Sequence, residues 1–173
     1  FPYTTSSDLH DPDEAMRIGD RVALMRDGRI VQEGTPLELY RAPRDPRAVG
    51  LFGGANLFHA KVTGGVAASP FGPAHCDHIS EGEWAEVIFR PSAVRVAEKG
   101  VPARIIALRP HAGELEVEAE LDPAAVPEGV EAPALVRAAA AFSPDLSAGA
   151  KVRLEARPED AFVFPCLDKV CRA

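Results

Sequence analysis

The residues from His10 to Tyr40 constrain the fold most, because local chemistry marks the start of each helix expected there. Asp11 can cap a helix whose first residue is Pro12, and proline suits that position because no amide hydrogen is needed there. Glu14 stands three residues after the cap, which is the spacing of a capping box. The sequence therefore predicts a helix that begins next to His10.

A hairpin and a second helix are expected directly afterwards. Residues 21–25 form a short apolar run, Asp27-Gly28 is a tight-turn signal, and residues 30–31 begin the returning strand. The run Thr35-Pro36-Leu37-Glu38 repeats the capping pattern, and this helix must end before Pro43. The stretch is thus predicted to fold as helix, hairpin and helix.

This stretch resembles the end of the nucleotide-binding domain in ATP-binding-cassette (ABC) importer ATPases. In that family a switch histidine precedes an aspartate and a Glu-Ala pair, and a hairpin, a Gly-Thr-Pro step and a helix with a late tyrosine follow. The matching positions are His10, Asp11, Glu14, Ala15, Met25, Gly28, Gly34, Thr35, Pro36 and Tyr40.

The resemblance implies a catalytic role for His10 in a full-length parent that binds ATP and Mg. His10 would sense the γ-phosphate there, and Asp11 and Glu14 would fix the helix start that aims it. A solvent-exposed His10 is the alternative in this chain, because no Walker A pattern, Walker B acid pair or LSGGQ-type signature occurs. Phosphoryl transfer needs a phosphate loop, a lysine, a metal-holding hydroxyl and an acid, so we expect this chain by itself to need no cofactor and to hydrolyse no ATP.

The sequence suggests a division into three parts. Residues 1–9 are polar where the family has a buried strand, and we interpret them as a leader or foreign junction, with divergent native sequence as the alternative. Residues 10–52 match the end of the ATPase domain, with one more short helix capped by Asp45-Pro46. The step Gly53-Gly54 and residues 55–58 resemble the family's Gly-x-x-Asn boundary, so a second domain is expected over 53–173.

Short strands are expected throughout the second domain, because apolar residues alternate between proline and glycine turns. We expect Arg90-Pro91 to stop the strand over 84–89 and Val94 and Val96 to continue it, and residues 135–142 fit either a helix or a strand. The other expected strands are 58–63, 104–108, 115–121, 152–156 and 161–164.

An internal repeat links residues 90–96, RPSAVRV, with residues 157–163, RPEDAFV. It indicates two small β units over about 57–98 and 101–165, each of which needs the other to bury its apolar face. Equal spacing from the Arg-Pro steps predicts burial on matching faces. The positions concerned are Val87, Val94, Val96, Leu154, Ala161 and Val163.

This second domain resembles the transport-associated OB-like (TOBE) region of ABC importers. The fold class is therefore expected to be mainly β, with OB-like barrel units and a small α/β segment at the start. The closing RPEDAFVFP is more similar to ferric-iron importer ATPases than to sugar importer ATPases. The resemblance implies a regulatory and dimerisation role.

Candidate metal ligands cluster in His75-Cys76-Asp77-His78, but adjacent ligands rarely converge on one ion, so we expect a polar loop and no metal. Cys166 and Cys171 are expected to be reduced thiols, with a disulfide as the alternative. Arg90 and Arg157 are expected to pair with local carboxylates or carbonyls, and the alternative interpretation is that they bind an anion.

Charge and hydropathy limit the partners. A net charge of −7 argues against nucleic acid, and no apolar run is long enough to insert into a membrane. The resemblance implies a homodimer bound to membrane permease subunits, cytoplasmic and peripheral at the inner face of the bacterial plasma membrane. An apolar face of Met16, Val22, Leu24 and Leu39 is expected to need cover in that dimer. The alternative function is a stand-alone OB-like module that binds an oxyanion or metal.

Overall fold

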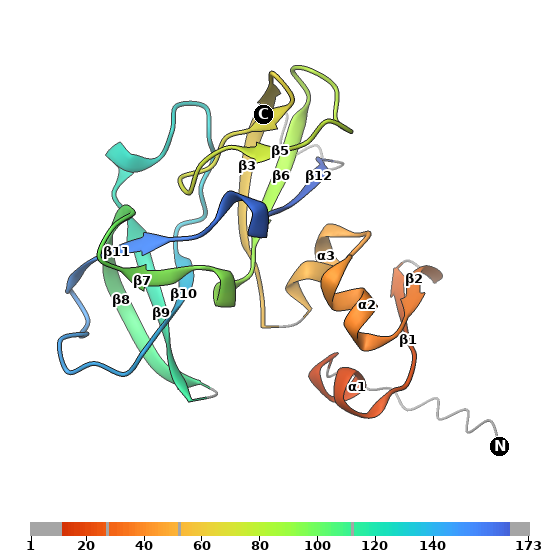
Figure 1. Cartoon of the computed structure of the whole chain (residues 1–173), viewed down its shortest axis with the longest axis horizontal. Helices are drawn as coiled ribbons and strands as arrows, with labels where there is room; N and C mark the ends of the chain where they lie inside the picture. The colour runs from red at the N-terminus through yellow and green to blue at the C-terminus, as the bar shows by residue number, and fades with distance from the viewer. Residues whose placement is uncertain (1–11, 27, 52, 112, 167–173) are drawn as a thin grey trace. The chain divides into compact units, whose positions relative to one another are not determined.

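The computed structural model describes residues 12–26, 28–51, 53–111 and 113–166. The chain forms two compact units, unit 1 within residues 1–52 and unit 2 within residues 53–173, and each is described by itself (Figure 1). No helix in the described ranges has the length and apolar character needed to cross a membrane.

Unit 1 contains the predicted helix, hairpin and helix. The two strands pair antiparallel through a turn at Gly28, whose φ of 74° suits glycine. Its elements are α1 (Pro12–Ile18), β1 (Val22–Arg26), β2 (Arg29–Gly34), α2 (Pro36–Arg41) and α3 (Pro46–Gly50).

The predicted capping box opens α2. The Thr35 hydroxyl accepts from the Glu38 amide at 3.3 Å, and the Glu38 carboxylate accepts from the Thr35 amide at 2.7 Å. The bond from the Thr35 amide is the main reason why the pKa of Glu38 lies below its ordinary value. Asp45 caps α3 in the same way by accepting from the Arg47 amide at 2.9 Å.

The packing of unit 1 corrects the expected apolar face at one position. Leu39 is already buried within the unit, as is Val49, whereas Met16, Val22 and Leu24 are half-buried. The large apolar side chains that remain exposed on unit 1 include Ile18, Met25, Ile30 and Leu37.

Unit 2 is built from two five-stranded assemblies, which confirms the mainly β, OB-like fold class. One is a closed barrel in the order β10-β7-β11-β8-β9, and the other, here called the open sheet, has the order β12-β6-β3-β4-β5. The strands are β3 (Asn56–Thr63), β4 (Val66–Ala67), β5 (Ala74–His75), β6 (Trp84–Phe89), β7 (Arg95–Ala97), β8 (Val101–His111), β9 (Glu114–Leu121), β10 (Val136–Ala140), β11 (Lys151–Glu155) and β12 (Phe162–Pro165).

The ambiguous stretch 135–142 is a strand in its central part, β10. It pairs antiparallel with β9, and Val136, Ala138 and Ala140 are buried. Alternating burial of this kind is the period of a strand, so the tertiary pairing overrides the helical preference of its alanines.

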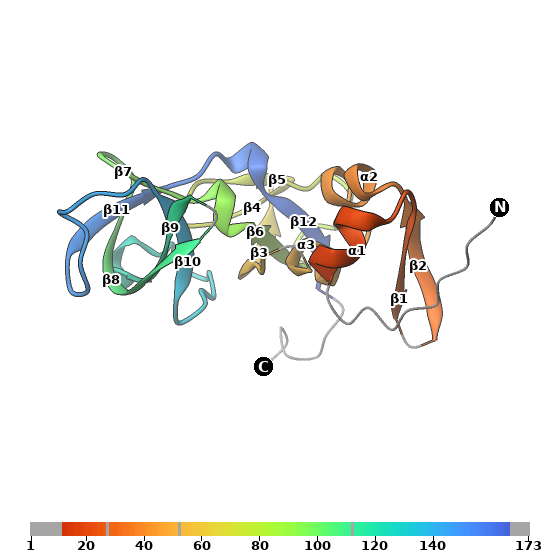
Figure 2. The ribbon, with the colours of Figure 1, turned by 90° about the horizontal axis from the view of Figure 1, so that it is seen from below.

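Two segments cross between the assemblies (Figure 2). The chain passes from β6 in the open sheet through the 3₁₀ turn η1 (Pro91–Ala93) to β7 in the barrel. It returns from β11 in the barrel through η3 (Pro158–Asp160) to β12 in the open sheet. β12 pairs with β6 and β7 pairs with β11, both antiparallel.

These crossings confirm that the strand over 84–89 stops at Arg90-Pro91, and they correct the prediction that Val94 and Val96 continue it. Pro91 lacks an amide hydrogen and starts a 3₁₀ turn, so the ladder of β6 ends and the chain leaves the sheet. The burial predicted around the two Arg-Pro steps is confirmed for Val87, Val94 and Leu154, which are fully buried. Val96, Ala161 and Val163 are only partly buried against the same core, so Val94 and Ala161 do not match in burial.

A buried asparagine fastens the open sheet to the barrel. The Asn56 side-chain amide donates to the Arg137 carbonyl oxygen at 2.8 Å, and its oxygen accepts from the Arg137 amide at 2.7 Å. The Asn56 side chain thus satisfies both backbone groups of Arg137 on β10, as the backbone of a neighbouring strand would. An aspartate could not donate and a serine could not reach both groups, which explains the side chain found at this boundary position.

Candidate functional site

The residues expected to act on nucleotide are mostly outside the described ranges. His10 and Asp11 fall there, and Glu14 is exposed on α1. The roles predicted for His10, Asp11 and Glu14 therefore stay predictions.

The structure does not bring His75, Cys76 and His78 together as ligands. Cys76 is buried in the core, where desolvation raises the pKa of its thiol, with a further rise from Asp77 and Glu81. His75 and His78 are exposed, so their side chains meet solvent while the sulfur faces the core. Among the described residues, the group with metal-ligand geometry lies elsewhere.

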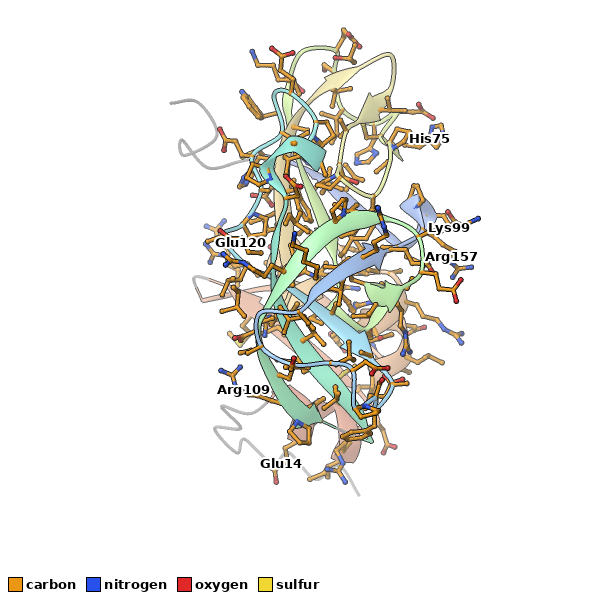
Figure 3. The ribbon with its side chains drawn as sticks, turned by 90° about the vertical axis from the view of Figure 1, so that its left-hand side faces the viewer. Glu14, His75, Lys99, Arg109, Glu120 and Arg157 are labelled. Atoms are coloured by element: carbon orange, nitrogen blue, oxygen red, sulfur yellow. The ribbon has the colours of Figure 1, made fainter. Side chains whose placement is uncertain are left out.

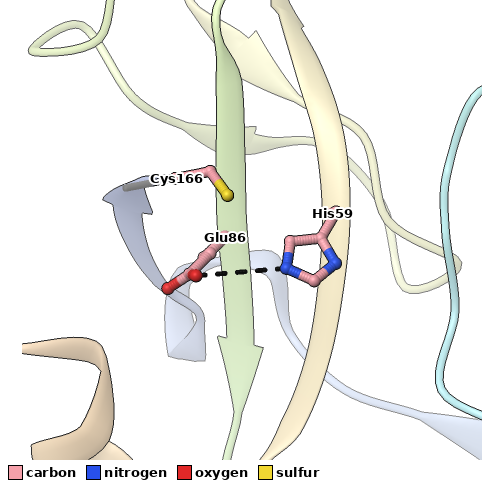
Figure 4. Close-up of side chains that lie close together, drawn as sticks. All are labelled: His59, Glu86 and Cys166. Atoms are coloured by element: carbon pink, nitrogen blue, oxygen red, sulfur yellow. Dashed lines mark ion pairs between the residues drawn. The ribbon is translucent and has the colours of Figure 1, made fainter. Parts of the chain in front are cut away.

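That group is His59, Glu86 and Cys166, whose ligand atoms all lie within 4.8 Å of one another (Figure 4). The His59 Nε2 atom is 4.0 Å from Glu86 Oε1. The three residues come from β3, β6 and the position directly after β12, which are neighbours in the open sheet. His59 stands opposite Glu86 in the β3–β6 register, and the Cys166 amide donates to the Trp84 carbonyl at 2.9 Å, which extends the β12–β6 pairing.

A second carboxylate faces the other side of the imidazole. His59 Nδ1 is 3.8 Å from Glu131 Oε2, and the backbones of His59 and Glu131 exchange hydrogen bonds of 3.0 and 2.8 Å. The histidine ring thus lies between two acids, and its side chain is 19% exposed.

The expected reduced state of Cys166 is wrong, because its sulfur is disulfide-bonded in the structure. Cys171 lies outside the described residues.

The two repeated arginines have different surroundings. Arg157 donates to both carboxylate oxygens of Asp160 at 3.0 and 3.1 Å, as predicted, and these bonds raise its pKa. Its side chain points outward (Figure 3). Arg90 is buried, and its guanidinium carbon lies 4.6 Å from the centre of the Phe162 ring.

A groove of about 810 Å³ runs over the start of β8 and the end of β9 on the barrel. Its charged lining is balanced: Arg104 pairs with Glu120 at 2.7 Å, and Arg153 donates to the Gly100 carbonyl at 3.0 Å. The other charged side chains that line it are Glu98, Asp122 and Lys151.

The chain is similar to several curated importer proteins, while no family model matches it. It is 36% identical over 149 residues to the Fe(3+) ions import ATP-binding protein FbpC of Streptomyces coelicolor, which covers 85% of this chain and 41% of that protein. It is 32% identical over 161 residues to the sulfate/thiosulfate import ATP-binding protein CysA 1 of Chromobacterium violaceum, covering 88% and 43%. The spermidine/putrescine import ATP-binding protein PotA of Escherichia coli is 36% identical over 99 residues, 51% of this chain and 26% of PotA.

The chain belongs to the ATP-binding subunits of ABC importers. It spans about two fifths of the length of the FbpC and CysA 1 relatives. The aligned 149 residues exceed unit 2 alone, so the similarity to the importer subunit reaches across both units.

Sequence reasoning on this chain missed the group of His59, Glu86 and Cys166. His59 and Glu86 are 27 positions apart, and only the strand register places them side by side. The sequence offered one signal for this group, which is the presence of polar residues at the outward-facing positions of the strands. That signal does not reveal which strands are neighbours.

Proposed function

We propose that this chain is the C-terminal regulatory and dimerisation part of an importer ATP-binding subunit of the ferric-iron type. The observation that carries the proposal is the similarity to the Fe(3+) import protein, which covers 85% of this chain and therefore reaches into both units. The closing sequence RPEDAFVFP, which resembles ferric-iron importer ATPases, also supports ferric iron as the transported solute.

In the full-length parent, ATP and Mg bind to segments that lie upstream of His10. ATP binding clamps two subunits together, and hydrolysis releases them and drives a membrane permease between its two access states. His10 holds the γ-phosphate in that cycle, and unit 2 keeps the two subunits together between cycles. The complex works at the cytoplasmic face of the bacterial plasma membrane.

The groove on the barrel does not favour the stand-alone oxyanion-binding alternative. An oxyanion needs unopposed donors, whereas Arg104 is already paired with Glu120 and the remaining lining carries both signs of charge. Regulation and dimerisation therefore remain the better proposal for unit 2.

The proposal is tested by adding this chain to a full-length importer subunit that ends in the same sequence. Both are produced in a bacterium that depends on that importer, with a tag on the full-length subunit. We expect the chain to copurify with the tagged subunit and to lower iron uptake, because mixed dimers lack one ATPase domain. The proposal is overturned if the chain does not copurify with the tagged subunit and iron uptake does not fall. A thermal shift of the isolated chain with molybdate or tungstate would support the oxyanion alternative.

A further inference from the structure

We propose that His59, Glu86 and Cys166 form a binding site for a divalent metal ion of the zinc class, which is available when the disulfide of Cys166 is reduced. The site lies on the open sheet of unit 2 and does not depend on the proposed role of unit 2 in an importer.

The backbone brings the three donors together. β3, β6 and β12 are consecutive in the open sheet, and directly opposed residues in antiparallel strands project from the same face. His59 opposes Glu86, and Glu86 opposes Phe164, so Cys166, two residues after Phe164, projects from that face as well. The sheet therefore holds the donors by backbone hydrogen bonds that are present whether or not an ion is bound.

The distances suit an ion after a small movement of the side chains. Ligand–zinc distances of about 2.0–2.3 Å in a tetrahedral arrangement place neighbouring ligand atoms about 3.3–3.8 Å apart. The ligand atoms here lie within 4.8 Å of one another, so each needs to move by less than a bond length. Rotation about the side-chain bonds of Glu86 and Cys166 supplies such a movement without a change in the strands.

The donor set selects the class of metal. An imidazole nitrogen, a carboxylate oxygen and a thiolate sulfur suit zinc and its neighbours among the divalent transition metals, whereas calcium and magnesium prefer oxygen ligands alone. Three protein ligands leave the fourth position of a tetrahedral ion to water.

Glu131 is placed as a positioning residue. Metal-binding histidines usually donate their second ring N–H to a carboxylate, which fixes the ring and its tautomer. With Nε2 facing Glu86, the Nδ1 atom of His59 faces Glu131 at 3.8 Å. The pair of backbone hydrogen bonds between His59 and Glu131 holds this carboxylate beside the ring.

Reduction of the disulfide makes the sulfur a ligand. A dithiol reductant attacks one sulfur of the disulfide, the sulfur–sulfur bond breaks, and the second thiol of the reductant resolves the mixed disulfide. Two electrons pass to the cysteine sulfurs, each of which takes up a proton, and the reductant leaves as a disulfide. The Cys166 thiol then releases its proton to solvent as its sulfur binds the ion.

The test uses the whole chain in oxidised form and after reduction with dithiothreitol, which is removed anaerobically before titration. Cobalt(II) is the probe, because a thiolate ligand gives it strong near-ultraviolet absorption, and zinc(II) is added as competitor. Cys166→Ser removes the sulfur and His59→Gln removes the nitrogen. Cys76→Ala is the matched control, because it removes the buried thiol outside the site. Thermal melting of each variant confirms that it is folded.

We expect the reduced chain to bind one cobalt per chain with thiolate absorption that zinc abolishes, and the oxidised chain to bind at least tenfold more weakly. Reduced Cys166→Ser is expected to lack the thiolate band, and Cys76→Ala to keep it. Glu131→Gln is expected to keep the band while affinity falls about tenfold. Equal binding by the oxidised and reduced chains, or a thiolate band that survives Cys166→Ser, would overturn the proposal.

Discussion

Unit 1 and unit 2 are stabilised by interactions of very different range along the sequence. In unit 1 the capping box joins two residues that are 3 positions apart. The Gln32 side chain donates to the Ala42 carbonyl, 10 positions away, and accepts from the Arg44 amide, 12 positions away. In unit 2 the equivalent side-chain bridge, from Asn56 to Arg137, spans 81 positions. Local chemistry therefore determines unit 1, whereas unit 2 depends on strands that cross between two assemblies.

The largest effect is expected from truncation of a core residue at either crossing. Leu154→Ala in the barrel should lower the free energy of unfolding by about 2–5 kcal/mol, because it leaves a cavity among fully buried side chains. Since β12 and β7 are exchanged between the assemblies, we expect Leu154→Ala and Val87→Ala each to shift the whole unfolding transition of unit 2 in urea.

The control is Leu37→Ala, because Leu37 is exposed on unit 1 and its truncation should change stability by no more than about 0.5 kcal/mol. If the barrel and the open sheet unfold separately in either core variant, the crossing strands do not couple them, and unit 2 does not depend on the crossings.

Asn56→Asp is expected to cost about 3 kcal/mol at neutral pH. The carboxylate cannot donate to the Arg137 carbonyl, and a charge would be buried without its donor. Gln32→Glu is the matched substitution in unit 1. There the side-chain bridge joins residues that are closer in the sequence, and Gln32 is slightly more exposed than Asn56. Urea unfolding should show a smaller loss for Gln32→Glu, confined to unit 1, and an equal loss for both would contradict the distinction.

The two Arg-Pro turns separate local from non-local effects within unit 2. Arg90→Ala should destabilise the protein by about 2 kcal/mol, because Arg90 is buried with its guanidinium over the Phe162 ring. Arg157→Ala should give no measurable change, because its ion pair with Asp160 is exposed to solvent. Thermal melting of the two variants measures the difference, and equal melting temperatures would show that the surroundings of Arg90 contribute nothing.

A smaller effect than that of Arg90→Ala is expected at the capping box of unit 1. Thr35→Ala should cost about 1 kcal/mol, because the Glu38 amide loses its acceptor. The folded-state pKa of Glu38 lies below its unfolded value, so its contribution is present above the unfolded pKa and is lost as the pH falls through the folded pKa. Urea unfolding of Glu38→Gln over acidic pH should therefore show a shallower loss of stability than the wild type, and an unchanged pH dependence would contradict this role.

The same difference in range explains what the sequence could predict. The starts of α2 and α3 are marked by capping residues that act within three positions, namely Thr35 with Glu38, and Asp45. These helices of unit 1 could therefore be placed from local sequence alone. In unit 2 the strands β3, β6, β8, β9, β11 and β12 followed from alternation, and the burial of Val87 and Leu154 followed from the Arg-Pro spacing. The short strands β4 and β5 did not. The pairing partners of the strands did not follow either, because the periodicity of a strand gives its faces and not its neighbours.

The candidate metal site was missed for the same reason. His59 and Glu86 become neighbours only through the register of β3 and β6, and Cys166 joins them only because β12 crosses to the open sheet. The side-by-side residues His75, Cys76 and His78 looked more like ligands in the sequence, yet burial of Cys76 directs its sulfur into the core.

The proposed role of this chain as the dimerisation part of an importer subunit is tested most directly by the mass of the chain in solution. Sedimentation velocity of the intact chain over a hundredfold range of concentration should show a species of twice 18.4 kDa that dissociates on dilution. A single species of 18.4 kDa at every concentration would contradict the claim.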